Sequence, residues 1–320
     1  MADLSTRQDA LPVPAAIGLL PMQRPRLRTG GVANLGRAIR SSKKAIVGLA
    51  LLLVFVAWSV APGLIAPYSA TYEGFAPSLG PSRLHWLGTT HYGQDIYSQI
   101  VWGARPSMVI ALVAGFFATV LSVFVGVSSA YLGGLSDDVI SLVTDVFLVI
   151  PTFPLVIVIA AYAHSQSDWV LIAVLVITGW SYGARQLRSQ TLSLRNRDFL
   201  ESARVRGERK LYVILAEILP TMTSLIVANF LGAALYAVLT AAGLQFVGLG
   251  DSSQISWGTM LYWAQNNEAL QTGQYLWATA PGLCIAGLGA AFALLNYAFD
   301  EISNPALRPI RRVRVKHSDS

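Results

Sequence analysis

Long apolar runs, separated by shorter polar segments, dominate the chain. A helix needs about 20 mostly apolar residues to cross a bilayer, because lipid offers no partners for its backbone hydrogen bonds. Several runs meet or approach that length. We therefore predict an all-α, polytopic membrane protein with six transmembrane helices, at residues 45–66, 107–132, 139–163, 169–184, 221–247 and 275–298.

The stretch 211–249 is too long for one span, yet it contains no loop that would divide it into two. Proline is favoured in the first turn of a helix and ends whatever helix precedes it. Pro220 therefore indicates a boundary. We predict an amphipathic segment at the membrane surface over residues 199–214 and one long, tilted span at 221–247.

Charged residues are scarce and gather in clusters. They make up 12% of the chain, and hydrophobic residues 54%, against roughly 25% charged residues in a soluble domain. Of the 23 Lys and Arg residues, eight lie in the N-terminal tail, eight between Arg185 and Lys210, and five between Arg308 and Lys316. These clusters do not alternate with aromatic residues, so the expected partner is membrane lipid and not nucleic acid.

Basic residues beside apolar runs mark the cytoplasmic side of a membrane protein. Six spans place all three basic clusters on that side, with both termini in the cytoplasm. No cleavage site follows the first span, so we expect an uncleaved anchor. The predicted organisation is a cytoplasmic tail (1–44), a first span (45–66), an extracytoplasmic segment (67–105), a core of five spans (106–300) with a cytoplasmic loop at 191–216, and a cytoplasmic tail (301–320).

Motifs for catalysis or cofactor binding are absent from the sequence. No Gly-Lys pair occurs, which excludes a phosphate-binding P-loop. Gly287 and Gly289 indicate a close helix–helix contact, and Cys284 is expected to be a small buried hydrophobic residue. The histidines lack the spacing of metal ligands, and we expect a solvated loop for each of them: His85, His91, His164 and His317. The chain is therefore expected to carry no cofactor, no metal and no enzyme activity.

Ionisable residues inside a membrane usually serve function. Asp145 is the one acidic residue well inside a predicted span, and Glu217 lies near an interface. A self-contained secondary carrier would be expected to place more such groups at mid-membrane. That alternative stays open on the residues alone, as does an interhelical hydrogen bond for Asp145.

The segment from Asp198 to Pro220 is the most informative. It predicts a short helix, a break at Gly207, a second helical stretch and a span that starts at a proline. Four apolar side chains can pack as one knob, with the basic side chains facing water or headgroups: Phe199, Leu200, Ala203 and Val205. An ordinary amphipathic helix at the membrane surface fits the same pattern.

This pattern resembles the cytoplasmic EAA loop of ABC-importer permeases. That loop has a glutamate, two small residues, a glycine four positions after the second of them, and a Leu-Pro pair whose proline falls thirteen positions after the glycine. The matching residues are Glu201, Ser202, Ala203, Gly207, Leu219 and Pro220, with Ser202 in place of the usual alanine. The resemblance implies a coupling helix that docks into a cleft of an ATPase subunit, with Arg206 in the same contact region.

Residues 35–310 resemble the C-type permease of dipeptide, oligopeptide and nickel importers. The motifs that carry this resemblance are His85-Trp-Leu-Gly-Thr89, Gly93-Gln-Asp95, Gly103-Ala-Arg105, Gly243-Leu-Gln-Phe-Val-Gly-Leu-Gly250 and Ser256-Trp-Gly258. They imply the type I ABC-importer (MetI-like) permease fold. They also imply a B-type permease partner, two ATPase subunits that hold ATP and Mg²⁺, and an extracytoplasmic binding protein.

Short peptides are the cargo that the resemblance implies, with oligosaccharides as the alternative. Nickel is less expected, because no His or Met cluster lines a span. Residues that could contact the pore, the substrate or the binding protein are Asp145, Trp86, Trp102, Asp251, Trp257 and Glu268. Anchoring at the membrane interface is an equally good interpretation of the aromatic residues.

Overall fold

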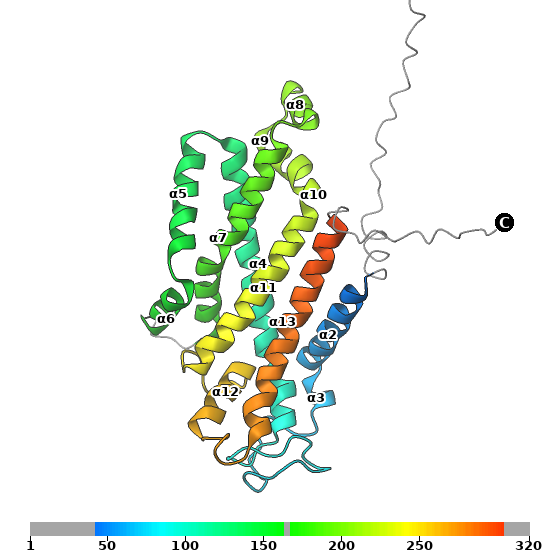
Figure 1. Ribbon diagram of the computed structural model, residues 1–320, viewed down its shortest axis with the longest axis vertical. Coiled ribbons are helices and arrows are strands. Elements are labelled where there is room, and N and C mark those ends of the chain that lie inside the picture. Colours follow the sequence, from blue (N-terminus) through cyan, green and yellow to red (C-terminus); the bar gives the residue numbers. More distant parts are fainter. Residues whose placement is uncertain (1–41, 163–166, 304–320) are drawn as a thin grey trace, which may run out of the picture.

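The computed structural model describes residues 42–162 and 167–303, and within them it is an elongated helical bundle (Figure 1). No strand occurs in these ranges, only an isolated bridge between Thr89 and Asp95. The helices are α2 (Lys43–Val60), α3 (Pro62–Ile65), α4 (Ile96–Leu132), α5 (Leu135–Val149), α6 (Thr152–Tyr162), α7 (Asp168–Leu194), α8 (Asp198–Val205), α9 (Lys210–Tyr212), the π-helix η1 (Val213–Ile218), α10 (Leu219–Thr221), α11 (Thr223–Phe246), α12 (Trp257–Asn266) and α13 (Tyr275–Ser303).

Five of these helices are long and apolar enough to cross a membrane: α2, α4, α7, α11 and α13. The bent pair α5 and α6 makes a sixth candidate if it counts as one span. The prediction of an all-α, polytopic membrane protein is therefore confirmed. α8 lies at one end of the bundle, which we call the α8 end (Figure 1). α12 and the segment 67–95 lie at the opposite end, which we call the α12 end.

The predicted span at 139–163 is divided into two helices. The chain turns by 90° between α5 and α6, and α6 points away from the bundle in Figure 1. Ile150 has an extended backbone (φ −65°, ψ 130°), which is the conformation that a following proline imposes on its neighbour. Pro151 therefore ends α5, and the end of the predicted span at residue 163 lies outside the described residues.

One helix start and one helix end also differ from the predictions. The helix expected at 107 begins at Ile96, where the Asp95 side chain accepts a hydrogen bond from the Ser98 amide at 2.8 Å. This cap satisfies a free N–H of the first turn, and the helix then continues through Pro106. The first helix, expected to reach residue 66, ends at Val60, before the short helix α3.

Pro220 does not begin the long span. The chain is helical from Lys210 to Thr221, with Pro220 inside the short helix α10 and the π-helix η1 before it. Proline lacks an N–H and clashes with the carbonyl of the preceding turn. A wider π-helical turn before Pro220 is one way to relieve that conflict. The expected surface segment 199–214 is therefore divided between α8, a turn and the start of this helix.

α4 lies at the centre of the bundle, against α7 and α11. Small residues make these contacts close: a Cβ on Gly126 would lie 2.3 Å from the Ala184 carbonyl oxygen, and one on Gly115 would lie 2.9 Å from the Ala234 backbone. Gly287, on α13, faces the Phe55 ring of α2, which agrees with the helix contact expected from the sequence. Close approach through small residues is typical of membrane helix packing.

Candidate coupling segment and membrane cavity

α8 ends in a Schellman motif. Gly207 has a φ of +73°, its amide donates to the Arg204 carbonyl at 2.9 Å, and the Glu208 amide donates to the Ala203 carbonyl at 3.2 Å. A left-handed residue at this position is usually glycine, because other residues have a Cβ that disfavours it. Gly207 therefore makes the sharp turn between α8 and α9, at the end of the bundle.

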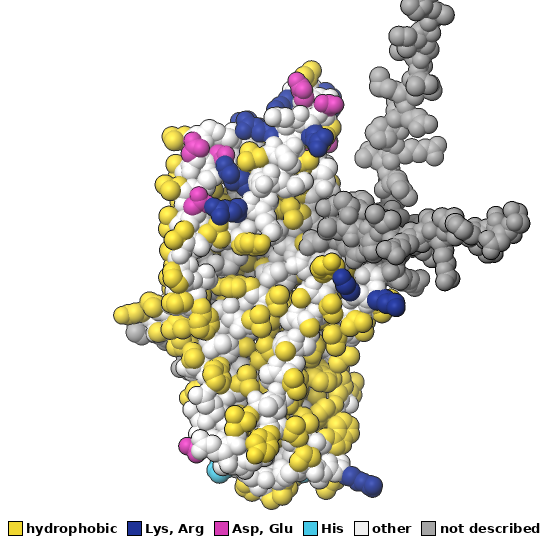
Figure 2. All heavy atoms as spheres, in the orientation of Figure 1, with side chains coloured by type: hydrophobic (Ala, Val, Ile, Leu, Met, Phe, Trp, Pro, Cys, Tyr) yellow, Lys and Arg dark blue, Asp and Glu magenta, His cyan; other side chains and the backbone are white. Residues whose placement is uncertain are grey.

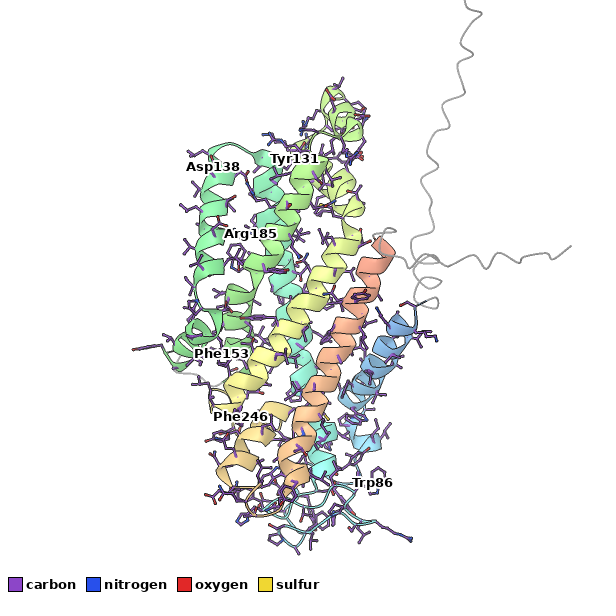
Figure 3. The ribbon with its side chains drawn as sticks, viewed as in Figure 1. Trp86, Tyr131, Asp138, Phe153, Arg185 and Phe246 are labelled. Atoms are coloured by element: carbon purple, nitrogen blue, oxygen red, sulfur yellow. The ribbon has the colours of Figure 1, made fainter. Side chains whose placement is uncertain are left out.

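One face of α8 is fastened to the bundle. Leu200 and Ala203 are fully buried and belong to an apolar cluster with Val213, Ile218 and Met222. Tyr131 of α4, labelled beside α8 in Figure 3, belongs to the same cluster. α8 therefore shares one apolar cluster with η1, α4 and α7.

The other face of α8 is exposed. Glu201 and Ser202 are both accessible, and Val205 is 84% exposed. The predicted apolar knob is therefore wrong as a unit, because Leu200 and Ala203 face their own chain whereas Phe199 and Val205 face outward. At a helical period of 3.6 residues, positions 200 and 203 share one side, which explains this division.

Arg206 joins the coupling segment to the π-helix. Its guanidinium lies 3.6 Å from the Glu208 carboxylate and 3.9 Å from that of Glu217. Glu217 is therefore an ion-pair partner and not an isolated interfacial acid. Leu219 packs at the edge of the same apolar cluster, and Pro220 is exposed.

A cavity of about 370 Å³ opens between α4, α7, α11 and α13. Uncharged polar side chains line much of it, among them Ser122, Tyr182, Gln186, Asn229 and Asn296. Gln186 donates to the Tyr182 hydroxyl at 3.2 Å, and Tyr182 is 65% exposed. The search for ionisable residues missed this site because its residues carry no charge. Polar residues spaced along four apolar helices were the available signal.

Ion pairs hold α5 against α7 towards the α8 end. The Arg188 guanidinium makes two hydrogen bonds to the Asp137 carboxylate, at 2.7 and 2.8 Å. Asp145 is hydrogen-bonded to Arg185, and Figure 3 shows Arg185 on α7, beside α5. Asp145 is thus paired within the chain, although both partners are more than half exposed.

The residues predicted to contact substrate or binding protein lie in different environments. Trp86 is exposed, and Trp102 donates to the Tyr68 carbonyl at 3.3 Å. Trp257 is fully buried and donates to the Ile100 carbonyl at 2.9 Å; it is a core residue, so an exposed contact role for it is wrong. Asp251 accepts from the Ser253 amide, and Glu268 is exposed at the end of α12.

The sequence suggested a solvated loop for His85, but this residue is buried. It is 5% exposed, and its Nδ1 lies 2.9 Å from the Asp95 carboxylate. Asp95 also accepts from the Ser98 hydroxyl at 2.7 Å. This buried group ties the irregular segment 67–95 to the start of α4. Among the described residues, no three His, Cys, Asp or Glu side chains gather as metal ligands would.

Charged side chains gather at the α8 end, and hydrophobic side chains cover the middle of the face seen in Figure 2.

A family described as "Binding-protein-dependent transport system inner membrane component" matches residues 119–309, which is more than half of the chain. The chain belongs to this family. It is a multi-pass membrane protein and a transport permease, and the resemblance inferred from the motifs is confirmed.

Curated relatives cover most of this permease. The oligopeptide transport system permease protein OppC of Mycobacterium tuberculosis is 31% identical over 70% of this chain and 78% of its own length. The dipeptide transport system permease protein DppC of Alkalihalophilus pseudofirmus is 30% identical over 85% and 89%. The glutathione transport system permease protein GsiD of Pectobacterium atrosepticum is 30% identical over 92% and 97%.

Proposed function

We propose that this permease forms half of the translocation pore of an ATP-binding-cassette importer for short peptides. A B-type permease would supply the other half of the pore. Two separate subunits would bind and hydrolyse ATP with Mg²⁺, and an extracytoplasmic binding protein would deliver the peptide. Both termini and the α8 end would lie in the cytoplasm, because the basic clusters lie beside these segments.

The observation that carries the proposal is the geometry of α8. A helix of eight residues stands at the end of the bundle, with one face fully buried on the membrane helices and the other exposed. An ATPase subunit bound to the exposed face would move α8, η1 and α4 together, because they share one apolar cluster. Such a rigid contact is suited to driving hinge or rigid-body motion of the spans.

The polar cavity supports a pore role. Amide and hydroxyl groups are costly in contact with lipid, so at membrane depth they face a helix partner or water. Tyr182 and Gln186 are exposed in the single chain, and they line the cavity with Asn229. We infer that this face turns towards the second permease, and that the cavity forms part of the path for the substrate.

The cargo is inferred from the relatives, which are named for oligopeptide, dipeptide and glutathione transport. An uncharged polar cavity suits a peptide backbone, because amides and hydroxyls can donate to and accept from its carbonyl and N–H groups. It places no fixed charge in the path, so peptides with different side chains could pass.

The test is uptake by the assembled complex in proteoliposomes, with labelled trialanine as the peptide and cellotriose as a comparison. We expect trialanine to accumulate only with ATP and all subunits present. Uptake of cellotriose instead would assign the oligosaccharide alternative. Trialanine uptake by this chain alone, without ATP, would show a secondary carrier and overturn the importer proposal.

A further inference from the structure

A second pocket, of about 360 Å³, lies at the α12 end of the bundle. It is formed by the segment 67–95, the first turn of α4, the chain around α12 and the start of α13. This volume falls within the range of pockets that bind small molecules. The coupling segment and the membrane cavity described above share no residue with it.

One wall of this pocket is a chain of side-chain amides that ends on a carboxylate. Gln99 donates to the Ala70 carbonyl at 3.3 Å and to the Gln94 side-chain oxygen at 2.6 Å. Gln94 in turn donates to the Glu73 carboxylate at 3.0 Å. Both N–H groups of Gln99 are therefore used, and the wall offers mainly acceptors, of which Glu73 is the charged one.

Two aromatic rings also line the pocket. The Tyr92 and Trp263 rings meet edge to face with centroids 6.0 Å apart, and the Trp263 indole is held by a hydrogen bond to the Ser252 carbonyl at 3.1 Å. None of the described residues that line the pocket is Lys, Arg or His. A carboxylate and two aromatic rings in one pocket, with no basic residue among the described lining residues, favour a cation as ligand.

The inner wall contains the buried side chain of Trp277. Trp277 is 1% exposed and lines the pocket, and its indole N–H has no hydrogen-bond partner among the described residues. A buried donor without an acceptor is costly, so such a group is usually met by a partner.

We propose that this pocket binds the N-terminal end of a short peptide through its primary α-ammonium group. Glu73 is the counter-ion, and Tyr92 and Trp263 supply aromatic faces to the ammonium. The choice of a peptide rests on the proposed function. The pocket would then hold one end of the cargo on the outer side before it enters the membrane cavity.

The test is a binding measurement on the assembled complex in nanodiscs, without the binding protein. The chain is labelled with 5-fluorotryptophan, and Trp263→Phe identifies the fluorine signal of Trp263. We expect trialanine to shift that signal in a saturable way and N-acetyl-trialanine, which lacks the ammonium, to leave it unchanged. Glu73→Gln should weaken trialanine binding at least tenfold.

Asp168→Asn is the matched control, because it removes one negative charge at the same end of the bundle from a residue that does not line the pocket. It should leave trialanine binding unchanged. Equal shifts with trialanine and its N-acetyl form, or no shift with either, would overturn the proposal. If only the binding protein shifts the signal, and acetylation of its lysines abolishes that shift, the ammonium belongs to the receptor and the peptide assignment is wrong.

Uptake separates this proposal from the function on which it rests. A complex that imports trialanine normally but shows no ammonium-dependent shift would retain the importer function without the pocket's role. A complex that imports no peptide would refute the peptide function itself, whatever the fluorine signal shows.

Discussion

At the scale of single residues, a substitution at Gly207 can show whether this position contacts a partner subunit, because little in the chain itself opposes a larger side chain there. Nothing lies within 4 Å of the position that a Cβ would take there, so a larger side chain meets no obstacle within the described chain. A left-handed backbone still costs roughly 1–2 kcal/mol for a residue other than glycine. We expect Gly207→Arg to leave the permease at normal levels in the membrane but to lower peptide uptake more than tenfold, because the side chain would obstruct ATPase docking.

Gly273 provides the matched control for that experiment. Its φ is +82° and it also has open space around its Cβ position, but it lies at the α12 end of the bundle. Gly273→Arg carries the same backbone cost and should retain most of the uptake. Equal losses in the two variants would attribute the effect to backbone strain and remove the support for a docking role of α8.

Gly126 tests the close packing of α4 against α7. A Cβ at this position would meet backbone atoms of Ala184, and backbone cannot move aside as a flexible side chain can. Overpacking a core typically costs 1–3 kcal/mol. We expect Gly126→Ala to lower the thermal unfolding midpoint of the purified permease. Gly282→Ala, at a helical position with no atom within 4 Å, should leave the midpoint unchanged or raise it slightly; equal falls would contradict the packing argument.

At the scale of elements, α5 and α6 have little contact with the rest of the bundle apart from α7 and α4. The ion pairs between α5 and α7 are therefore expected to contribute to the stability of the permease. The Asp137–Arg188 pair is bidentate and its carboxylate is mostly buried. Removing one partner of a charged hydrogen bond costs about 1–3 kcal/mol. We expect Asp137→Asn to lower the thermal midpoint and to speed proteolysis around α5.

Asp138→Asn is the control for this pair. Asp138 is the exposed neighbour of Asp137 on the same helix, and it is labelled at the top of α5 in Figure 3. Its substitution should change stability by no more than about 0.5 kcal/mol. If both variants behave alike, total charge and not the specific pair would be the cause.

The sequence predicted the spans well, because a long apolar run has few alternatives to a helix in lipid. It also contained the cause of the bend after α5, since Pro151 stands in the predicted span, but one proline does not distinguish a kink from a 90° turn. The short helix α12 was missed. Its available signal was Ser256 before Trp257, which forms a capping box with Thr259.

The sites were harder to predict than the spans. The candidate coupling residues follow a local pattern, so Glu201, Gly207 and their neighbours could be proposed from their resemblance to a family motif. The membrane cavity and the ammonium pocket each bring together residues far apart in the chain, such as Gln94 and Trp263. The burial of His85 depends in the same way on packing across a segment of irregular backbone. Contacts of this kind have no period or spacing in the sequence.

At the scale of the whole molecule, the proposed orientation can be tested with the chain's own cysteine content. Cys284 is the single cysteine, so a Cys284→Ala background allows one reporter thiol to be placed at each end. Ser193, at the α8 end, and Thr272, at the α12 end, are both exposed.

With the basic clusters in the cytoplasm, we expect Thr272→Cys to react with a membrane-impermeant maleimide in intact cells. Ser193→Cys should react only after the membrane is permeabilised, which also shows that its thiol is accessible. The reverse pattern would place α8 outside the cell, where no ATP-driven subunit could reach it, and would refute the coupling role together with the orientation. The distribution of basic residues favours the first result, because only Arg83 and Arg105 of the 23 Lys and Arg residues lie outside the three clusters, and both belong to the segment assigned to the outer side.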